Sequence, residues 1–237
     1  MPESLCLLVE VPVCAFRPYA SREYQDTYPV PSPASVYGML LSLLGVPRED
    51  KNPHRLPGVP REDKGRHRGA ELALAVEALP PRSKVFRKLR RGDDLENMRP
   101  DYQDVLTDLR LWVWVRRGTE PVQPCLADRL GAALLERFAA VTRTGGVSLG
   151  ENSYLVNAVS AASPPAALVF VTPDPTGFYS LPIWVDHAAA ANTQLARFRI
   201  DEEARPVAEA LPLAWFRIPL PPPKVEPTPA KRSRRKP

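Results

Sequence analysis

Six cations fall within the ten residues 82–91, which read Arg-Ser-Lys-Val-Phe-Arg-Lys-Leu-Arg-Arg. A cationic run interleaved with apolar side chains suits contacts with phosphates, because each cation that meets a phosphate releases condensed counterions. An acidic stretch follows at once, so the run can equally form a self-paired, solvated surface. The candidate phosphate contacts of the run are Lys84, Arg87, Lys88, Arg90 and Arg91.

A glycine-rich segment, RTGGVSLGENSYLV at 143–156, is the second candidate site. Glycines permit positive φ and let backbone N–H groups approach a phosphate or ribose closely. Arg143, Gly145 and Gly146 are therefore candidate contacts with nucleic acid. The alternative is a tight connection between a helix and a strand that needs the glycines only for its turn.

Catalytic groups are sparse. Metal-free RNA cleavage needs a base and a cation placed around the 2′-hydroxyl and the leaving oxygen. The histidines are His54, His67 and His187, and no pattern aligns a tyrosine (Tyr19, Tyr24 or Tyr102) with Lys84 or Lys88. The sequence contains no Walker loop, no paired metal-ligand carboxylates and no Cys/His cluster. We therefore expect a noncatalytic protein without cofactor or metal.

The net charge of +5 is concentrated at one end of the chain. Residues 224–237 hold six cations and one carboxylate, which leaves the remaining body formally neutral. The three cysteines are scattered, which is typical of buried thiols in a reducing compartment. The sequence shows no leader pattern and no long apolar stretch, so we expect a cytoplasmic protein with no membrane contact.

The elements that must position these side chains form an α+β pattern. Strands are predicted at 4–13, 70–79, 108–117 and near 154–160, and helices at 32–44 and 127–140. This β-α-β-β-α-β order is the ferredoxin-like arrangement shared with RNA-recognition domains. The segment 70–79 is also compatible with a helix, and we assign it as a strand because Pro80-Pro81 ends it early.

Local signals support several of these elements. Ser32 can cap a helix that begins at Pro33, and Gly45 can end it in the left-handed conformation. Residues 108–117 alternate strictly, with Leu109, Leu111, Val113 and Val115 on one face and Arg110, Trp112, Trp114 and Arg116 on the other. The helix at 127–140 is expected to bury Leu130, Leu134, Leu135 and Phe138.

The expected organisation is a domain at 1–160, a small C-terminal β region at 161–220 and a disordered, Pro-rich basic tail at 221–237. Within the domain, GVPREDK at 45–51 recurs at 58–64, which predicts a duplicated surface loop over 45–69. Loops tolerate such insertions at little thermodynamic cost.

The amino-acid sequence of the first strand and helix resembles that of a known family. "PSPASVYGMLLSLLGV" (31–46), which follows "VEVPVCAFRPYASREYQDTYPV" (9–30), resembles CRISPR-associated Cas family five of the RAMP superfamily. "NMRPDYQDVLTDLRLWVWV" (97–115) is similar to the family's Arg-x-x-x-x-x-Leu-x-Asp motif and places Arg99, Tyr102, Leu106 and Asp108 in it. The sequence around 97–108 is most similar to that of the I-B-like group of this family. Asp108 can instead simply turn the chain into the strand.

The resemblance implies a subunit of a type I Cascade complex that caps the 5′ handle of the guide RNA (crRNA). It implies contacts with the backbone and large subunits, only indirect contact with target DNA, and a thumb-like excursion over 80–105. Arg17, Arg22, Tyr24, Arg99 and Tyr102 would then be further handle contacts.

Two alternatives remain open. Some relatives are RAMP endoribonucleases that process precursor crRNA. A general RNA-recognition domain would instead use Trp112 and Trp114 as a stacking platform, unless these pack under the C-terminal strands.

Overall fold

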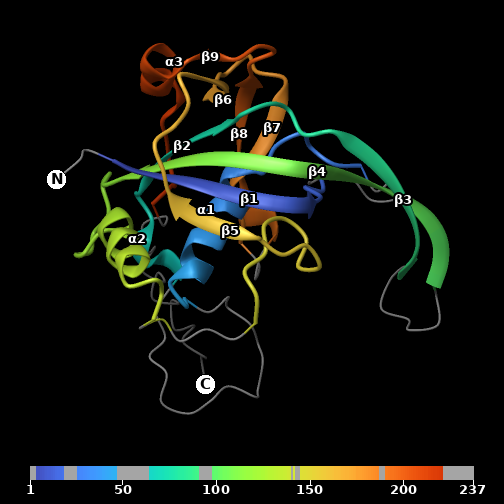
Figure 1. Ribbon diagram of the computed structural model, residues 1–237, viewed down its shortest axis with the longest axis horizontal. Coiled ribbons are helices and arrows are strands. Elements are labelled where there is room, and N and C mark those ends of the chain that lie inside the picture. Colours follow the sequence, from blue (N-terminus) through green and yellow to red (C-terminus); the bar gives the residue numbers. More distant parts are fainter. Residues whose placement is uncertain are drawn as a thin grey trace, which may run out of the picture.

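A computed structural model describes residues 4–18, 26–46, 64–90, 98–139, 141, 145–186 and 190–220 of the 237-residue chain. The described residues form a mixed α+β structure in which an antiparallel sheet carries helices on both faces (Figure 1). None of the helices in these ranges has both the length and the apolar character that crossing a bilayer requires.

The strands and helices follow one another in this order along the chain. The strands are β1 (Leu5–Cys14), β2 (Glu71–Val76), β3 (Arg82–Arg90), β4 (Met98–Arg116), β5 (Ala158–Ala161), β6 (Ala167–Pro173), β7 (Tyr179–Trp184), β8 (Gln194–Ile200), β9 (Arg205–Pro206) and β10 (Phe216–Arg217). The helices are α1 (Pro33–Leu43), α2 (Leu126–Leu135) and α3 (Val207–Ala214), with 3₁₀ turns at Lys64–His67 and Ala190–Asn192.

The sheet runs in the order β5-β1-β4-β2-β6-β8-β7, and every pairing along it is antiparallel. Of the short or lateral strands, β3 pairs with β4, β10 with β2 and β9 with β6. The strands after residue 161 thus continue the same sheet through the β2–β6 pairing.

The signals for α1 are confirmed. Ser32 is the N-cap, and its Oγ accepts a hydrogen bond from the Ser35 backbone N–H at 3.2 Å. Pro33 occupies the first turn, where its missing N–H costs nothing. Gly45 takes φ 71° directly after the C-cap Leu44 and ends the helix as expected.

The two faces of the sheet are buried differently. Leu109, Leu111, Val113 and Val115 point into the main core with α1 and α2, as their alternation predicts. Trp112 and Trp114 belong to a second cluster under β6 and α3, where Trp114 stacks on Phe170 with ring centroids 5.7 Å apart. In Figure 1, α1 and α2 lie on one side of β1 and β4, and α3 lies on the other.

Strand β4 is longer than the alternating pattern indicates, because it begins at Met98 rather than near 108. Its second half pairs with β1 and β2, and its first half pairs mainly with β3. Asp108 lies between the two halves with φ 54°, a left-handed conformation that interrupts the β1–β4 register. The segment 80–105 is therefore largely an extended hairpin.

Helix α2 ends earlier than predicted, and the expected burial of Leu135 is wrong. The helix stops at Leu135, after which Arg137 and Phe138 take φ values of 51° and 58°. Leu130 is fully buried, but Leu135 lies roughly 140° further around a helix of 3.6 residues per turn and is 88% exposed.

Candidate nucleic-acid interface

The most prominent feature outside the core is the β3–β4 hairpin, which we call the arm (Arg82–Arg90 with Met98–Leu106). Its register runs from Arg82 opposite Leu106 to Arg90 opposite Met98. In Figure 1 the arm projects away from the body at the end of the sheet opposite α2. As far as Arg90, the cationic run identified in the sequence forms one whole strand of this arm.

One face of the arm carries an exposed aromatic pair. Phe86 and Tyr102 are directly opposite each other, with ring centroids 5.1 Å apart and planes tilted by 55°. They are 62% and 56% exposed, and the exposed Lys84 precedes them on the same face. Aromatic faces beside cations are the components of a single-stranded RNA contact.

The base of the arm is fixed on this face by Arg82. Its Nη1 lies 3.0 Å from Asp26 Oδ1 and 3.3 Å from Asp104 Oδ2, and its Nη2 donates to the Thr27 carbonyl at 2.6 Å. The Asp104 carboxylate is buried at 3% exposure, so it needs this cation. Thr27 in turn accepts a hydrogen bond from the Phe16 backbone N–H at 2.7 Å and links the arm to the end of β1.

The other face of the arm is fixed by the glycine-rich segment. Gln103 Nε2 donates to Glu151 Oε1 at 2.7 Å, and Arg17 Nη2 lies 3.8 Å from the same oxygen. Gln103 is 1% exposed, whereas nearly half of the Arg17 side chain is exposed. The arm is therefore braced from both faces at its base, and Arg17 lies beside one brace.

The glycines of this segment have different roles. Gly150 has φ 86°, and a Cβ there would overlap the Ala15 carbonyl oxygen, so glycine is needed for close packing against the end of β1. Gly145 has φ 80°, and a Cβ at this position would have no neighbour within 4 Å, so its backbone faces open space. A Cβ at Gly146 would meet the Leu155 side chain at 2.9 Å. Gly150 thus fits the tight-turn interpretation, and Gly145 is accessible to a ligand.

The structure brings only some of the sequence-predicted residues together. Lys84 and Tyr102 lie on the arm, and Arg17 reaches the arm base through Glu151. The strands of the arm also contain Arg87, Lys88, Arg90 and Arg99, whose backbone register is described. Arg22, Tyr24, Arg91 and Arg143 lie outside the described residues.

Among the candidate catalytic groups of the described residues, Lys84 and Tyr102 share one face of the arm, whereas His67 is buried beside α2. His67 is 1% exposed; Glu120 Oε1 lies 3.0 Å from its Nδ1, and Arg129 Nη1 lies 2.9 Å from its Nε2. His54, His187, Tyr19 and Tyr24 lie outside these ranges. No group of His, Cys, Asp and Glu within the described residues could hold a metal ion.

The outer face of the sheet does not offer an aromatic platform. Trp112 and Trp114 are each 3% exposed, so no base can stack on them. Beside them, Arg110 of β4 forms ion pairs with Glu10 of β1 at 2.6 Å and with Glu77, the residue after β2, at 2.9 Å. The C-terminal packing expected for the tryptophans is confirmed, and their use as an open stacking platform is excluded.

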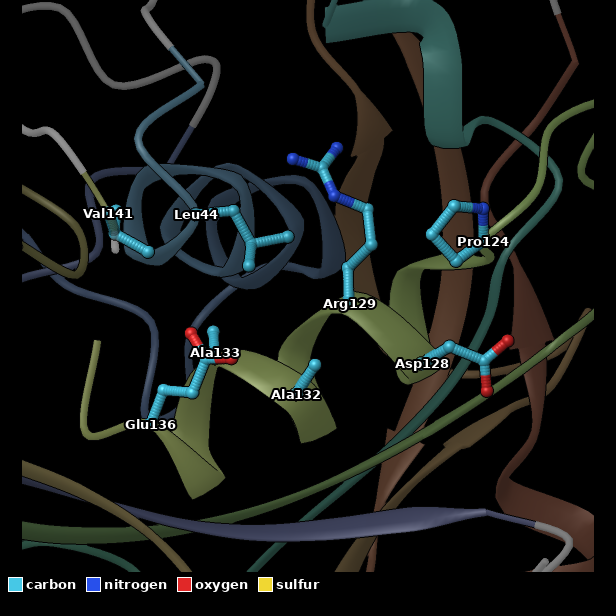
Figure 2. Close-up of a pocket in the computed structure, with 8 residues that line it drawn as sticks. All are labelled: Leu44, Pro124, Asp128, Arg129, Ala132, Ala133, Glu136 and Val141. Atoms are coloured by element: carbon cyan, nitrogen blue, oxygen red, sulfur yellow. The ribbon is translucent and has the colours of Figure 1, made fainter. Parts of the chain in front are cut away.

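A depression of about 520 Å³ lies between the end of α1 and α2. Its walls are mainly apolar and come from Leu44, Pro124, Ala132, Ala133 and Val141, with Asp128, Arg129 and Glu136 around them (Figure 2). Figure 2 shows the Asp128 side chain directed away from Glu136, so the two carboxylates do not converge. The lining residues therefore provide shape but no paired acid and base.

Sequence reasoning missed several residues at the arm base. Arg82 belongs to the cationic run, and its position directly after Pro80-Pro81, at the start of a strand, is the signal that could have distinguished it. Gln103 and Glu151 are 48 residues apart, and no local pattern relates them.

Known proteins resemble the chain both in sequence and in fold. No family model matches the chain. A protein of Myxococcus xanthus (strain DK1622) named CRISPR-associated protein Cas5 is 35% identical over 229 residues, which cover 91% of this chain and 97% of that protein. A solved structure described as a CRISPR RNA-guided surveillance complex has a similar fold, with a TM-score of 0.55, 16% identity, and coverage of 86% of this chain and 92% of that one.

Proposed function

Because the chain belongs to the CRISPR-associated Cas5 family, we propose that it is a noncatalytic subunit of a type I Cascade complex that binds and caps the 5′ handle of the crRNA. The likeness to a chain of an RNA-guided surveillance complex supports an assembly role. In this proposal the protein contacts the backbone and large subunits in the cytoplasm and reaches target DNA only indirectly.

The observation that carries the proposal is the arm. One of its strands comes from the ten-residue segment that contains six cations. The same hairpin, which is braced at its base, also carries the exposed Phe86–Tyr102 pair. The cations bind phosphates and the aromatic rings stack on bases, a combination that suits a single strand better than a duplex. We infer that the arm is the thumb of the subunit.

We also infer that the arm is built on a ferredoxin-like unit. The strands β5-β1-β4-β2 are antiparallel in the order expected for that arrangement, and both α1 and α2 contribute to the core on one face. In this view residues 1–160 are the RNA-binding domain, and the strands from 161 to 220 extend its sheet. The arm then replaces the open sheet face as the RNA contact.

The experiment that tests this function measures binding of a repeat-derived single-stranded RNA at several salt concentrations. Replacing Arg87, Lys88, Arg90 and Arg91 by Ala should weaken binding and reduce the salt slope by roughly 0.7 for each phosphate that is no longer neutralised. The matched control replaces Arg232, Arg234, Arg235 and Lys236 by Ala, which removes the same charge from the tail. Equal effects of both variants would mean nonspecific attraction and would contradict the proposal.

The alternative function is an endoribonuclease that processes precursor crRNA. The buried, doubly engaged His67 is not available as a base, which favours the noncatalytic role. Incubating the protein with repeat RNA in EDTA distinguishes the noncatalytic role from the endoribonuclease role. Cleavage at one position would overturn the noncatalytic role, and intact RNA bound by the protein would support it.

A further inference from the structure

An exposed aromatic residue lies on the turn between β6 and β7. Phe178 is 86% exposed, and its ring packs edge-to-face on Tyr179 with centroids 5.1 Å apart. Tyr179 meets Tyr28 in the same manner at 6.3 Å, and the Tyr28 hydroxyl donates to the Ser180 carbonyl at 3.0 Å. These three rings form a continuous row that we call the aromatic ridge (Tyr28, Tyr179 and Phe178).

The turn that presents Phe178 is held in one conformation. Asp174 Oδ1 accepts hydrogen bonds from the Thr176 backbone N–H at 2.8 Å and from its hydroxyl at 2.7 Å. The Gly177 N–H donates to the Asp174 carbonyl at 2.8 Å, and a Cβ at Gly177 would overlap the Phe198 backbone. The hydrogen-bonded turn fixes the backbone from which the exposed Phe178 projects, which lowers the ordering cost of a contact there.

A cation accompanies the exposed ring. Arg197 Nη1 lies 3.4 Å from the Gly177 carbonyl, directly before Phe178. Arg197 is exposed and forms no ion pair with a carboxylate of the described residues, unlike Arg199, which lies 3.5 Å from Asp174. The turn therefore offers a positive charge beside an open aromatic face.

The ridge is continuous with the base of the arm. Tyr28 directly follows Thr27, whose carbonyl accepts the Arg82 hydrogen bond at 2.6 Å. The Tyr28 end of the ridge therefore adjoins the base of the arm. Burial, together with the Asp26 carboxylate, raises the pKa of Tyr28 above its ordinary value.

We propose that the aromatic ridge and Arg197 form a second contact for single-stranded RNA, in which Phe178 stacks on a base and Arg197 binds a neighbouring phosphate. This site rests on the proposed function, because it extends the path of the RNA bound by the arm. RNA is favoured over a protein surface because Arg197 has no carboxylate partner in the described ranges and the ridge leads to the arm base.

The test uses the full chain and a repeat-derived single-stranded RNA that carries 2-aminopurine at successive positions. Phe178→Ala should weaken binding about 5- to 140-fold, the range that corresponds to removal of one aromatic–base stack. It should also relieve 2-aminopurine quenching at one position, and Phe178→Trp should restore both. Arg197→Ala should lower the salt slope by roughly 0.7. The matched control is Leu135→Ala, because Leu135 is exposed to a similar extent at 88% but lies on α2.

The possible results separate the two proposals. Unchanged RNA affinity and quenching in Phe178→Ala, with weak binding by the arm variant, would overturn the ridge and leave the proposed function intact. Unchanged RNA affinity in Phe178→Ala, with failure to bind another Cascade subunit, would also overturn it, in favour of a protein contact. Unchanged affinity in both variants would overturn both proposals.

Discussion

Gln103 and Glu151 meet at 2.7 Å across 48 residues of sequence and join the arm to the glycine-rich segment. Gln103 is almost fully buried, so its amide cannot exchange this bond for one with bulk water. Arg17 lies 3.8 Å from the same carboxylate oxygen, so a candidate RNA contact depends on the position of Glu151. The brace thus couples the base of the arm to the segment that follows α2.

Gln103→Ala should loosen this coupling. We expect a decrease of about 1 kcal/mol in unfolding free energy, because one buried hydrogen bond is removed and Glu151 remains partly solvated. Amide hydrogen exchange should rise in the arm and around residue 151 but not in α1. Ser160→Ala on the exposed edge of β5 is the control, and an unchanged exchange pattern in Gln103→Ala would show that the brace does not hold the arm.

Two glycine substitutions should separate conformational strain from steric overlap. Gly145→Ala places a side chain at φ 80° in open space and should cost about 1 kcal/mol. Gly150→Ala adds an overlap with the Ala15 carbonyl at φ 86° and should cost roughly a further 1–3 kcal/mol. Urea denaturation of both variants measures the difference. Equal destabilisation would mean that the segment around Gly150 shifts without penalty.

The fold was predictable where local signals agree with packing. Helix α1 carries its own cap, proline and terminal glycine, and the core half of β4 alternates strictly between two buried faces. The first half of β4 is not recognisable from its pattern, because Pro100 and the surrounding charges disrupt the alternation. Its strand conformation comes from pairing with β3, a contact that no local pattern encodes. The expectation for Leu135 was wrong because this residue lies about 140° around the helix from the buried Leu130 and so points away from the core.

The candidate site was only partly predictable for a similar reason. A cationic run is visible in composition, so Lys84 and its neighbours could be identified directly. Arg82, Gln103 and Glu151 act through contacts between distant segments, and their residue types alone do not distinguish them from ordinary surface groups. Phe178 follows an Asp-Pro-Thr-Gly sequence that indicates a turn, but its exposure depends on the packing of β6 to β8.

The cysteines should be unreactive in the folded protein. Burial raises the pKa of Cys14 to about 12 and that of Cys6 to about 11, and it also raises the pKa of Cys125, which donates to Asp128 at 3.1 Å. At pH 8 the thiolate fraction of Cys6 is then on the order of 0.001. Reaction of Cys6 and Cys14 with a disulfide reagent should be at least about 100-fold slower than for free cysteine and should accelerate with pH. All three thiols should react rapidly in denaturant, and one fast thiol in the native protein would contradict the assignment.

A buried network should stabilise α2 without changing the affinity for RNA; it consists of His67, Glu120 and Arg129. Arginine can only donate, so His67 Nε2 accepts a hydrogen bond from Arg129. The ring N–H is then at Nδ1 and donates a hydrogen bond to Glu120. Glu120 Oε1 also accepts the backbone N–H of Leu126 at 2.9 Å, while the N-cap Cys125 forms no side-chain cap bond. A residue outside the helix therefore performs the capping.

His67→Leu should cost about 1–3 kcal/mol, because it removes one hydrogen-bond donor from the buried Glu120 carboxylate. The double variant His67→Leu/Glu120→Met removes both partners and should recover part of this stability, so the two changes should not be additive. Urea denaturation of the wild type, both single variants and the double variant measures the coupling. RNA affinity should be unchanged throughout, since the network lies beside α2 rather than at the arm. Additive destabilisation would mean that His67 and Glu120 stabilise the fold independently, and a selective defect of RNA binding in folded His67→Leu would move the interface toward α2.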